Sequence, residues 1–247
     1  MKVLVTGAAG FLGQGMIQTL GAEHTLRLMD VIPQESQHES IVGDVCDLEA
    51  VRSAAAGMDA IVAGHMAPRA PGVYDVPTLP FDINVKGVAH LFQAAVETGI
   101  KRMVLISSTS VVLADQRAGN FLRRDLAHSS GDIYSLTKSL QETVAEHFHR
   151  NFGISVAILR PAYITDEDTM INKYGRKAET VNWQFIDRRD IGDAANAALR
   201  LPDLGCEVFY VLGHPDALEH ADVAHTHERL GWHPRHDFTK YPRDAEP

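Results

Sequence analysis

The feature that most constrains this fold is a glycine-rich segment that directly follows an apolar run. The segment reads TGAAGFLG over residues 6–13, and residues 1–5 precede it as MKVLV. Its first glycine permits a tight turn off a strand, its second lets backbone N–H groups approach a bound group, and its third lets a helix pack close to a sheet. The N-terminus of that helix carries a partial positive charge. The segment therefore predicts a strand–turn–helix unit that holds a pyrophosphate.

An acidic residue, Asp30, stands at the end of the second predicted strand, over 25–30. A carboxylate there would accept hydrogen bonds from adenosine ribose hydroxyls and repel a 2′-phosphate, which favours NAD over NADP as the cofactor. The alternative is that Asp30 is a solvated residue at a strand end. Asp44 follows the third strand and would either lie near the adenine or cap the next helix, for which Asp47 is the better candidate.

A second motif lies far from the first. Tyr134 and Lys138 are four residues apart and share one face of a helix predicted over 133–151. An ordinary phenol has a pKa of about 10, but a nearby ammonium and a positive nicotinamide ring favour the phenolate. Tyr134 would then take a proton from a substrate hydroxyl as hydride leaves the same carbon. Alone, this spacing is more often a surface tyrosine and a solvated lysine; its pairing with the glycine-rich segment favours the catalytic interpretation.

Apolar runs alternate with amphipathic stretches along most of the chain. Strands are predicted over 3–6, 25–30, 39–42, 60–63, 102–106, 154–159, 184–186 and 208–212, and helices over 12–20, 48–56, 81–98, 133–151 and 191–199. Strands that are apolar throughout, separated by helices, indicate a parallel sheet covered on both faces. Right-handed crossovers then give an α/β doubly wound parallel sheet, the Rossmann fold.

The alternation fails over about 162–181, a polar stretch that we expect to be an irregular cap. Loops beyond the carboxyl ends of strands are where substrates usually bind. We therefore expect one structural domain with three parts. They are an NAD-binding Rossmann core over 1–161, a small substrate cap or lid over 162–183, and the remaining Rossmann elements with a substrate-side segment over 184–240.

Composition excludes several classes of function. The formal net charge of −9 argues against a nucleic-acid surface. No segment approaches the roughly 20 apolar residues that cross a membrane, and we expect no signal peptide. Cys46 and Cys206 are far apart in the sequence, so no disulfide framework is expected and a cytoplasmic location is the default. His225 and His227 lack supporting ligands, so we expect no metal site.

Together these motifs resemble the extended, epimerase-like branch of the short-chain dehydrogenase/reductase family. Its signature combines TGxxGxxG, a Ser or Thr after the fifth strand, and YxxxK. Further matches are NVKG over 84–87, LRP over 159–161 and LGWHP over 230–234. The resemblance covers nearly the whole chain.

Carried over position by position, the resemblance implies Tyr134 as the general base and Lys138 as its partner. Thr109 falls where the catalytic Ser or Thr stands, with Ser108 one residue away as the alternative. The cofactor contacts that it implies are Gly7, Ala9, Gly10, Phe11, Leu12, Gly13, Asp30, Asp44, Val45, Ala63, Gly64, Asn84, Ser107, Tyr134, Lys138 and Pro161. Ser110 is a candidate residue for contact with the substrate.

Two departures from the family narrow the substrate. The family's HLAA after the fourth strand is AGHMA over 63–67, and its VYG is VLA over 112–114, which weakens a nucleotide-sugar assignment. The chain is also short, a layout similar to uronate dehydrogenases, which oxidise a sugar acid at its anomeric carbon with NAD. Their substrate arginine would correspond to Arg176, which with Lys173 and Lys177 could clamp a carboxylate. The alternative is a solvated basic loop.

Three functions follow as hypotheses. The first is an NAD-dependent oxidoreductase that transfers hydride between NAD and a hydroxyl or carbonyl of a small sugar or sugar acid. The second is a nucleotide-sugar epimerase or dehydratase with tightly bound NAD, and the third is a non-catalytic NAD-binding sensor or scaffold. The resemblance also implies a homodimer through the helices at 82–98 and 133–151.

Overall fold

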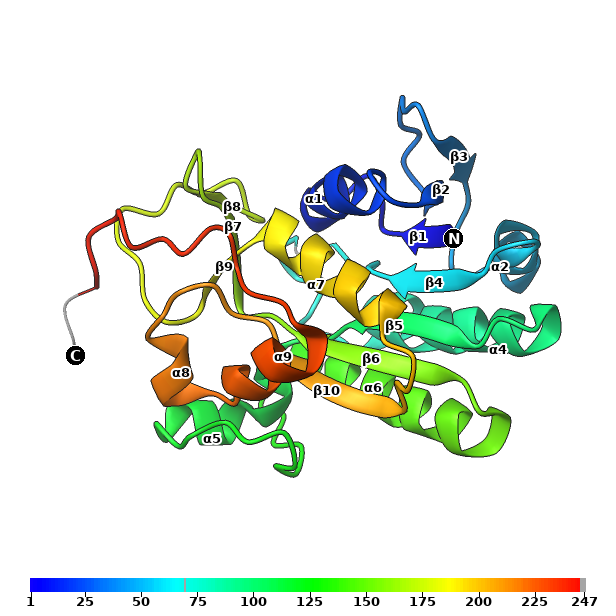
Figure 1. Cartoon of the computed structure of the whole chain (residues 1–247). Helices are drawn as coiled ribbons and strands as arrows, with labels where there is room; N and C mark the ends of the chain where they lie inside the picture. Colours follow the sequence, from blue (N-terminus) through cyan, green and yellow to red (C-terminus); the bar gives the residue numbers. More distant parts are fainter. Residues whose placement is uncertain (69, 245–247) are drawn as a thin grey trace.

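The computed structural model describes residues 1–68 and 70–244, and a seven-stranded parallel sheet forms its centre (Figure 1). The strand order is β10-β6-β5-β4-β1-β2-β3. The strands are β1 (Lys2–Thr6), β2 (Thr25–Asp30), β3 (Glu39–Val42), β4 (Ala60–Ala63), β5 (Arg102–Ile106), β6 (Ser155–Arg160) and β10 (Cys206–Tyr210). The order reverses between β1 and β4, and at such a switch point the connections diverge and leave a crevice beyond the carboxyl ends of the strands. The expected doubly wound α/β fold is confirmed.

Helices cover both faces of this sheet. The longer ones are α1 (Phe11–Leu20), α2 (Leu48–Ala55), α4 (Gly87–Thr98), α6 (Ile133–Phe152), α7 (Arg188–Arg200) and α9 (Val223–Leu230). The short ones are α3 (Thr78–Pro80), α5 (Leu113–Arg117) and α8 (Ala217–His220), with a 3-10 turn over Thr109–Val112. Successive residues of a strand point to opposite faces, so Val3 and Val5 pack with α1 and α7 while Leu4 packs with α2 and α4. Burial on both faces explains why the central strands β1, β4, β5 and β6 are largely apolar, whereas the edge strand β3 is mostly exposed.

The helix predicted over 81–98 is two elements. A π-helical segment, Phe81–Lys86, precedes α4, and the N–H of Gly87 donates to the carbonyl of Asp82, five residues back. Gln141 Nε2 on α6 donates to the carbonyl of Asn84 at 2.8 Å. The Asn84 carbonyl therefore accepts a hydrogen bond from a side chain of the neighbouring helix, whereas in a regular α-helix it would accept the backbone N–H four residues later.

The segment expected to be irregular, 162–183, contains two short strands. β7 (Tyr163–Asp166) pairs parallel with β9 (Phe185–Asp187) and antiparallel with β8 (Ile171–Asn172), which makes a second, three-stranded sheet. These strands have four, three and two residues, respectively. Elements this short show no periodicity that a sequence pattern can detect.

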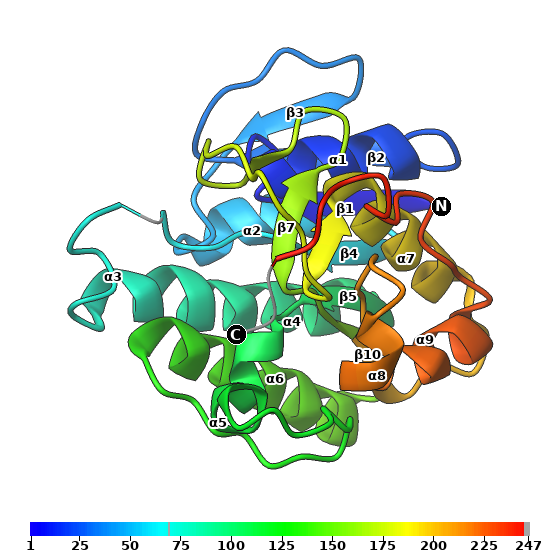
Figure 2. The same cartoon turned by 90° about the vertical axis from the view of Figure 1, so that its left-hand side faces the viewer.

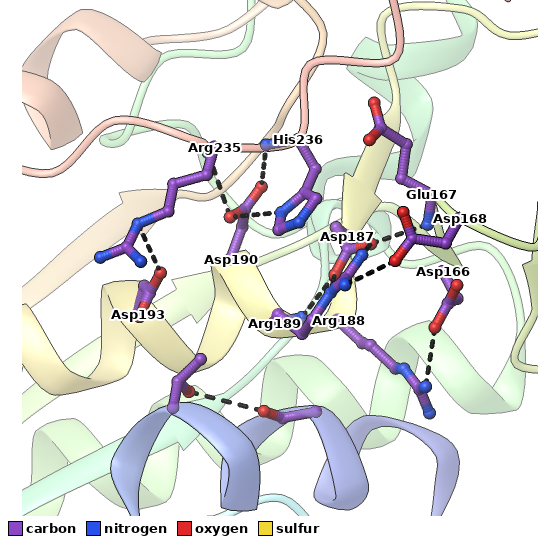
Figure 3. Close-up of polar contacts among 12 residues, drawn as sticks. Asp166, Glu167, Asp168, Asp187, Arg188, Arg189, Asp190, Asp193, Arg235 and His236 are labelled. Carbon is purple, nitrogen blue, oxygen red and sulfur yellow. Dashed lines mark hydrogen bonds and ion pairs between the residues drawn. The ribbon is translucent and has the colours of Figure 1, made fainter. Parts of the chain in front are cut away.

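The acidic triplet at 166–168 fastens this small sheet to neighbouring segments (Figure 3). The backbone N–H of Glu167 donates to the carboxylate of Asp187 at 2.7 Å. The Glu167 side chain accepts the backbone N–H of Phe238 at 2.9 Å. The small sheet is thereby fastened to the start of α7 and to the C-terminal segment at 235–241, which passes beside β7 in Figure 2.

Within residues 1–68 and 70–244, no helix has both the length and the apolar character to span a bilayer. Cys46 and Cys206 are free thiols. Burial raises the pKa of Cys46 to about 11 and that of Cys206 to about 12. Both thiols are therefore protonated and weakly nucleophilic at neutral pH.

Candidate active site

A cavity of about 500 Å³ lies where β1, β2, β4 and β5 end, at the switch point of the sheet. Among the sequence-predicted residues, those that line it are Gly7, Ala9, Gly10, Phe11, Leu12, Gly13, Asp30, Asp44, Val45, Gly64, Ser107, Tyr134 and Lys138. The structure thus brings the glycine-rich segment and the Tyr–Lys pair to one cavity, although more than a hundred residues separate them in the chain.

The turn from β1 into α1 leaves no room for side chains at two of its glycines. Gly7 has a left-handed φ of +70°, and a Cβ there would lie 2.7 Å from the Cα of His65. A Cβ on Gly13 would lie 2.6 Å from the carbonyl oxygen of Ala8. The turn is therefore pressed against the end of β4, and α1 is pressed against the turn.

This turn fits the diphosphate of a dinucleotide. Gly10 is the N-cap of α1 and supplies no side-chain cap, so the first backbone N–H groups of the helix remain available to a bound anion. At the far end of the cavity, Asp30 accepts backbone N–H groups from Ala9 at 3.0 Å and from Ile32 at 3.1 Å. These bonds orient a carboxylate at the position where the ribose hydroxyls of adenosine would bind.

The structure distinguishes between the two roles predicted for Asp44, a position near the adenine and the cap of α2. Asp47 accepts the backbone N–H groups of Glu49 and Ala50 and caps α2. Asp44 accepts the N–H of Cys46 at 2.8 Å and lines the cavity instead.

Tyr134 and Lys138 are fixed at the opposite end of the cavity. They are 7% and 3% exposed, respectively, and both line it. A capping box at Asp132 and Ser135 starts α6 at Ile133, which sets the rotation of the helix. Lys138 Nζ donates to the carbonyl of Ile106 at the end of β5, at 2.7 Å.

Of the hydroxyl side chains after β5, Ser107 lines the cavity and the others do not. Ser108 caps the 3-10 turn and accepts a hydrogen bond from the hydroxyl of Ser110 at 2.9 Å. Thr109 is buried, and its N–H donates to the carbonyl of Pro161 at 3.0 Å. Ser108, Thr109 and Ser110 therefore belong to a turn that adjoins the cavity.

Four other predicted cofactor or substrate residues also stand outside the lining, among them Pro161, whose carbonyl accepts the N–H of Thr109. Ala63 is buried at the end of β4. Asn84 is buried as well, and its side chain accepts the N–H of Ala67 at 2.7 Å and donates to Thr137 at 2.9 Å. Arg176 is exposed, with its N–H bonded to Asn172.

Sequence reasoning gave less weight to Lys173, which the structure places at the cavity. This residue follows β8, and its Nζ lies 5.8 Å from the ring centroid of Tyr134 and 5.5 Å from that of Tyr174. The pairing of β8 with β7 decides which cation of the basic loop reaches the cavity, and no signal in the sequence shows that pairing.

His65, part of the departure from the family's HLAA, is a buried residue of the cavity wall. Burial, with the charge of Lys138 added, lowers the pKa of His65 to about 3. Its Nδ1 lies 2.9 Å from Thr6 Oγ1 and its Nε2 3.2 Å from the carbonyl of Ile83. The neutral ring therefore accepts from Thr6 and donates to Ile83. A Cβ on Gly87 would lie 3.0 Å from this ring, so glycine at 87 makes room for it.

We expect His65 to make folding pH-dependent. The folded protein keeps His65 neutral, whereas the unfolded chain protonates it below about pH 6.5, so its contribution is present above pH 6.5 and is lost as pH falls toward 3. Within this window the free energy of unfolding should fall by about 1.4 kcal/mol per pH unit more in the wild type than in His65→Gln. Urea titrations at several pH values measure the two slopes, and equal slopes would contradict the assignment.

The described residues contain no group of three or more His, Cys, Asp or Glu side chains that could hold a metal ion.

Comparison with known proteins agrees with this geometry. A family model described as NAD(P)H-binding matches residues 7–202. A uronate dehydrogenase of Pseudomonas syringae pv. tomato is 30% identical over 85% of this chain and 73% of that protein. An NAD-dependent glucose-6-phosphate dehydrogenase of Haloferax volcanii is 25% identical over 99% of this chain and 97% of that protein.

Among solved structures, uronate dehydrogenase from Agrobacterium tumefaciens is 25% identical, with a TM-score of 0.79 over 100% of this chain and 91% of that chain. The expected resemblance to the uronate dehydrogenases is therefore confirmed. The chain belongs to the NAD(P)H-binding family.

Proposed function

We propose that this protein is an NAD-dependent oxidoreductase that acts on a hydroxyl or carbonyl carbon of a small sugar or sugar acid. The observation that carries the proposal is that Tyr134 and Lys138 line the same cavity as the glycine-rich turn and Asp30. A protein that only binds a dinucleotide needs no general base beside it.

The cofactor end of the cavity favours NAD. The N-terminus of α1 and the turn that precedes it hold the diphosphate, and Asp30 accepts the ribose hydroxyls and repels a 2′-phosphate. Asp44 and Val45 stand beside the adenine. NAD, when bound, supplies the oxidant that accepts two electrons from the substrate carbon.

At the other end, Tyr134 accepts the proton of the substrate hydroxyl. The ammonium of Lys138, one helical turn away, stabilises negative charge on the phenolic oxygen. We assign the polarisation of the substrate oxygen to the turn after β5, through Thr109 or Ser108, with Ser110 on the substrate side. Segment 162–183 acts as the substrate cap over the Rossmann core.

The cation at the cavity points to an anionic substrate. Lys173 lies beside the Tyr134 ring, and within the described residues no carboxylate forms an ion pair with it. A carboxylate or phosphate on a sugar bound at Tyr134 would supply the missing negative charge. The two curated relatives described above are named for a uronate and a sugar phosphate, which are both anionic. Arg176 is the second candidate for this contact.

The reaction can be measured as NADH formation with a panel of uronic acids, sugar phosphates and neutral aldoses. We expect turnover with NAD and at least tenfold weaker use of NADP, and Tyr134→Phe should lower kcat by about 10²- to 10⁴-fold. Tyr241→Phe, outside the cavity, is the control and should keep the wild-type kcat.

Other outcomes of this assay would replace the proposal. Cofactor that co-purifies, with no net release of NADH, would favour an epimerase or dehydratase. NADH binding without turnover of any sugar, unaffected by Tyr134→Phe, would favour a non-catalytic sensor or scaffold.

The anion contact has a separate test. Lys173→Met should raise KM for an anionic substrate about tenfold or more, because a hydrogen bond to a charged group is lost, and leave KM for a neutral aldose unchanged. Arg176→Met and Lys177→Met carry the same charge change in the same loop. If only Arg176→Met raises KM, the arginine is the anion contact and Lys173 is not.

We also propose a cytoplasmic homodimer through α4 and α6. In support, Leu136 and Phe152 on α6 are exposed apolar side chains. Sedimentation should give the mass of two chains, and replacing both residues with Lys should shift it toward one. A wild-type protein that sediments as one chain at every concentration would contradict the dimer.

A further inference from the structure

A carboxylate is buried beneath the catalytic end of the cavity. Glu142 lies on α6, four residues after Lys138, and is 1% exposed. Its Oε1 accepts from the hydroxyl of Ser107 and from Arg160 Nε at 3.0 Å. Its Oε2 accepts from Arg160 Nη2 at 2.7 Å and from His128 Nε2 at 2.9 Å. One side chain therefore joins α6 to the ends of β5 and β6 and to the loop before α6.

This carboxylate is ionised. Burial alone would raise the pKa of Glu142, but hydrogen bonds from His128 and Arg160, with the charge of Arg160, lower it to about 2. An ionised carboxylate accepts hydrogen bonds and donates none. The hydrogen in each of its contacts therefore belongs to the partner.

The consequence falls on Ser107, whose hydroxyl has a single hydrogen. That hydrogen is committed to Glu142, so Ser107 presents only oxygen lone pairs to the cavity that it lines. Serine hydroxyls usually rotate to suit either a donor or an acceptor. Here the buried carboxylate of Glu142 holds the single hydrogen of the Ser107 hydroxyl, so toward the cavity this hydroxyl can only accept a hydrogen bond.

The place of Ser107 decides which donor it meets. It follows Ile106, whose carbonyl holds Lys138 Nζ at 2.7 Å, and so stands at the Tyr134 end of the cavity, opposite Asp30. A dinucleotide bound with its adenosine at Asp30 brings its nicotinamide to this end, and the N–H donors of that ring system are on its carboxamide.

We propose that Glu142 is a positioning residue that holds Ser107 as the hydrogen-bond acceptor for the carboxamide N–H of the nicotinamide. This inference rests on the proposed function, because it requires the cavity to bind the dinucleotide. Glu142 itself touches neither cofactor nor substrate; it acts through the Ser107 hydroxyl.

A buried ion pair is weak evidence for stability, since desolvation of both charges offsets their attraction. Arg160 is 2% exposed and also donates to Tyr210 at 3.1 Å, so it is as deeply buried as Glu142. The pair is better explained by what it orients. The strand ends that it joins carry Ser107 and Pro161, and the helix carries Tyr134 and Lys138.

Cofactor binding tests the proposal without relying on turnover. The affinities of NADH and of the reduced 3-acetylpyridine analogue, which has a methyl group in place of the carboxamide NH2, are measured by fluorescence titration. The wild type should prefer NADH by about three- to tenfold, the worth of one hydrogen bond. Ser107→Ala should bring this ratio close to one.

Ser139→Ala is the matched control, because it removes another buried hydroxyl, one that bonds Ser130 at 2.6 Å, from the same helix as Glu142. It should keep the wild-type ratio. A ratio that is unchanged in Ser107→Ala, or no preference in the wild type, would overturn the proposal. A wild type that binds no NADH would overturn the proposed function as well, so the two failures are distinguishable.

The role of Glu142 needs a second variant. Removing Glu142 alone would leave Arg160 as an unpaired buried charge and endanger folding, so both are replaced by Met, which leaves neither charge behind. NADH should still bind to this double variant, with the preference over the analogue lost. If the double variant keeps the preference that Ser107→Ala loses, Ser107 meets the carboxamide without help and the role of Glu142 is refuted.

Discussion

The rest of the structure depends on the close approach between the turn after β1 and the end of β4. These neighbouring strands stand on the two sides of the point where the strand order reverses. The turn approaches the backbone of Gly64 and His65 closely, so backbone N–H groups rather than side chains would face a diphosphate bound in the crevice. The NAD-binding end of the cavity is a consequence of that contact.

The cap is coupled to the same turn through Arg188. Its guanidinium stands 4.8 Å from the ring centroid of Phe11, in the glycine-rich turn, and pairs with Asp166 at 2.7 Å at the end of β7. Gly15 in α1 leaves room for this side chain, since a Cβ there would lie 2.7 Å from its Cγ. The glycine-rich turn and the segment proposed as the cap are therefore joined through one cation, which has an aromatic ring on one side and a carboxylate on the other.

The sequence was most informative where local chemistry alone decides the structure. The strands over 25–30, 39–42, 60–63 and 102–106 have the predicted bounds. Those over 60–63 and 102–106 are largely apolar and buried on both faces, whereas the edge strand over 39–42 is mostly exposed. The residues at the cavity that were hard to predict are those placed by distant contacts. Lys173 lies at the cavity because β8 pairs with β7. Thr109 lies in a 3-10 turn and does not line the cavity. The position of Glu142 could be predicted from the sequence, because it lies one helical turn beyond Lys138 on the same helix face.

The way the cap is anchored determines when it can form during synthesis. The first four strands and their helices are consecutive in the chain, so the nucleotide-binding half can assemble from segments that leave the ribosome early. The contacts that fasten the small sheet and α7 to the C-terminal segment form later, because Glu167 bonds the backbone of Phe238 and Asp190 bonds that of Arg235 and His236. A nascent chain can thus have a formed glycine-rich turn well before the segment at 162–183 is fastened to the C-terminal segment.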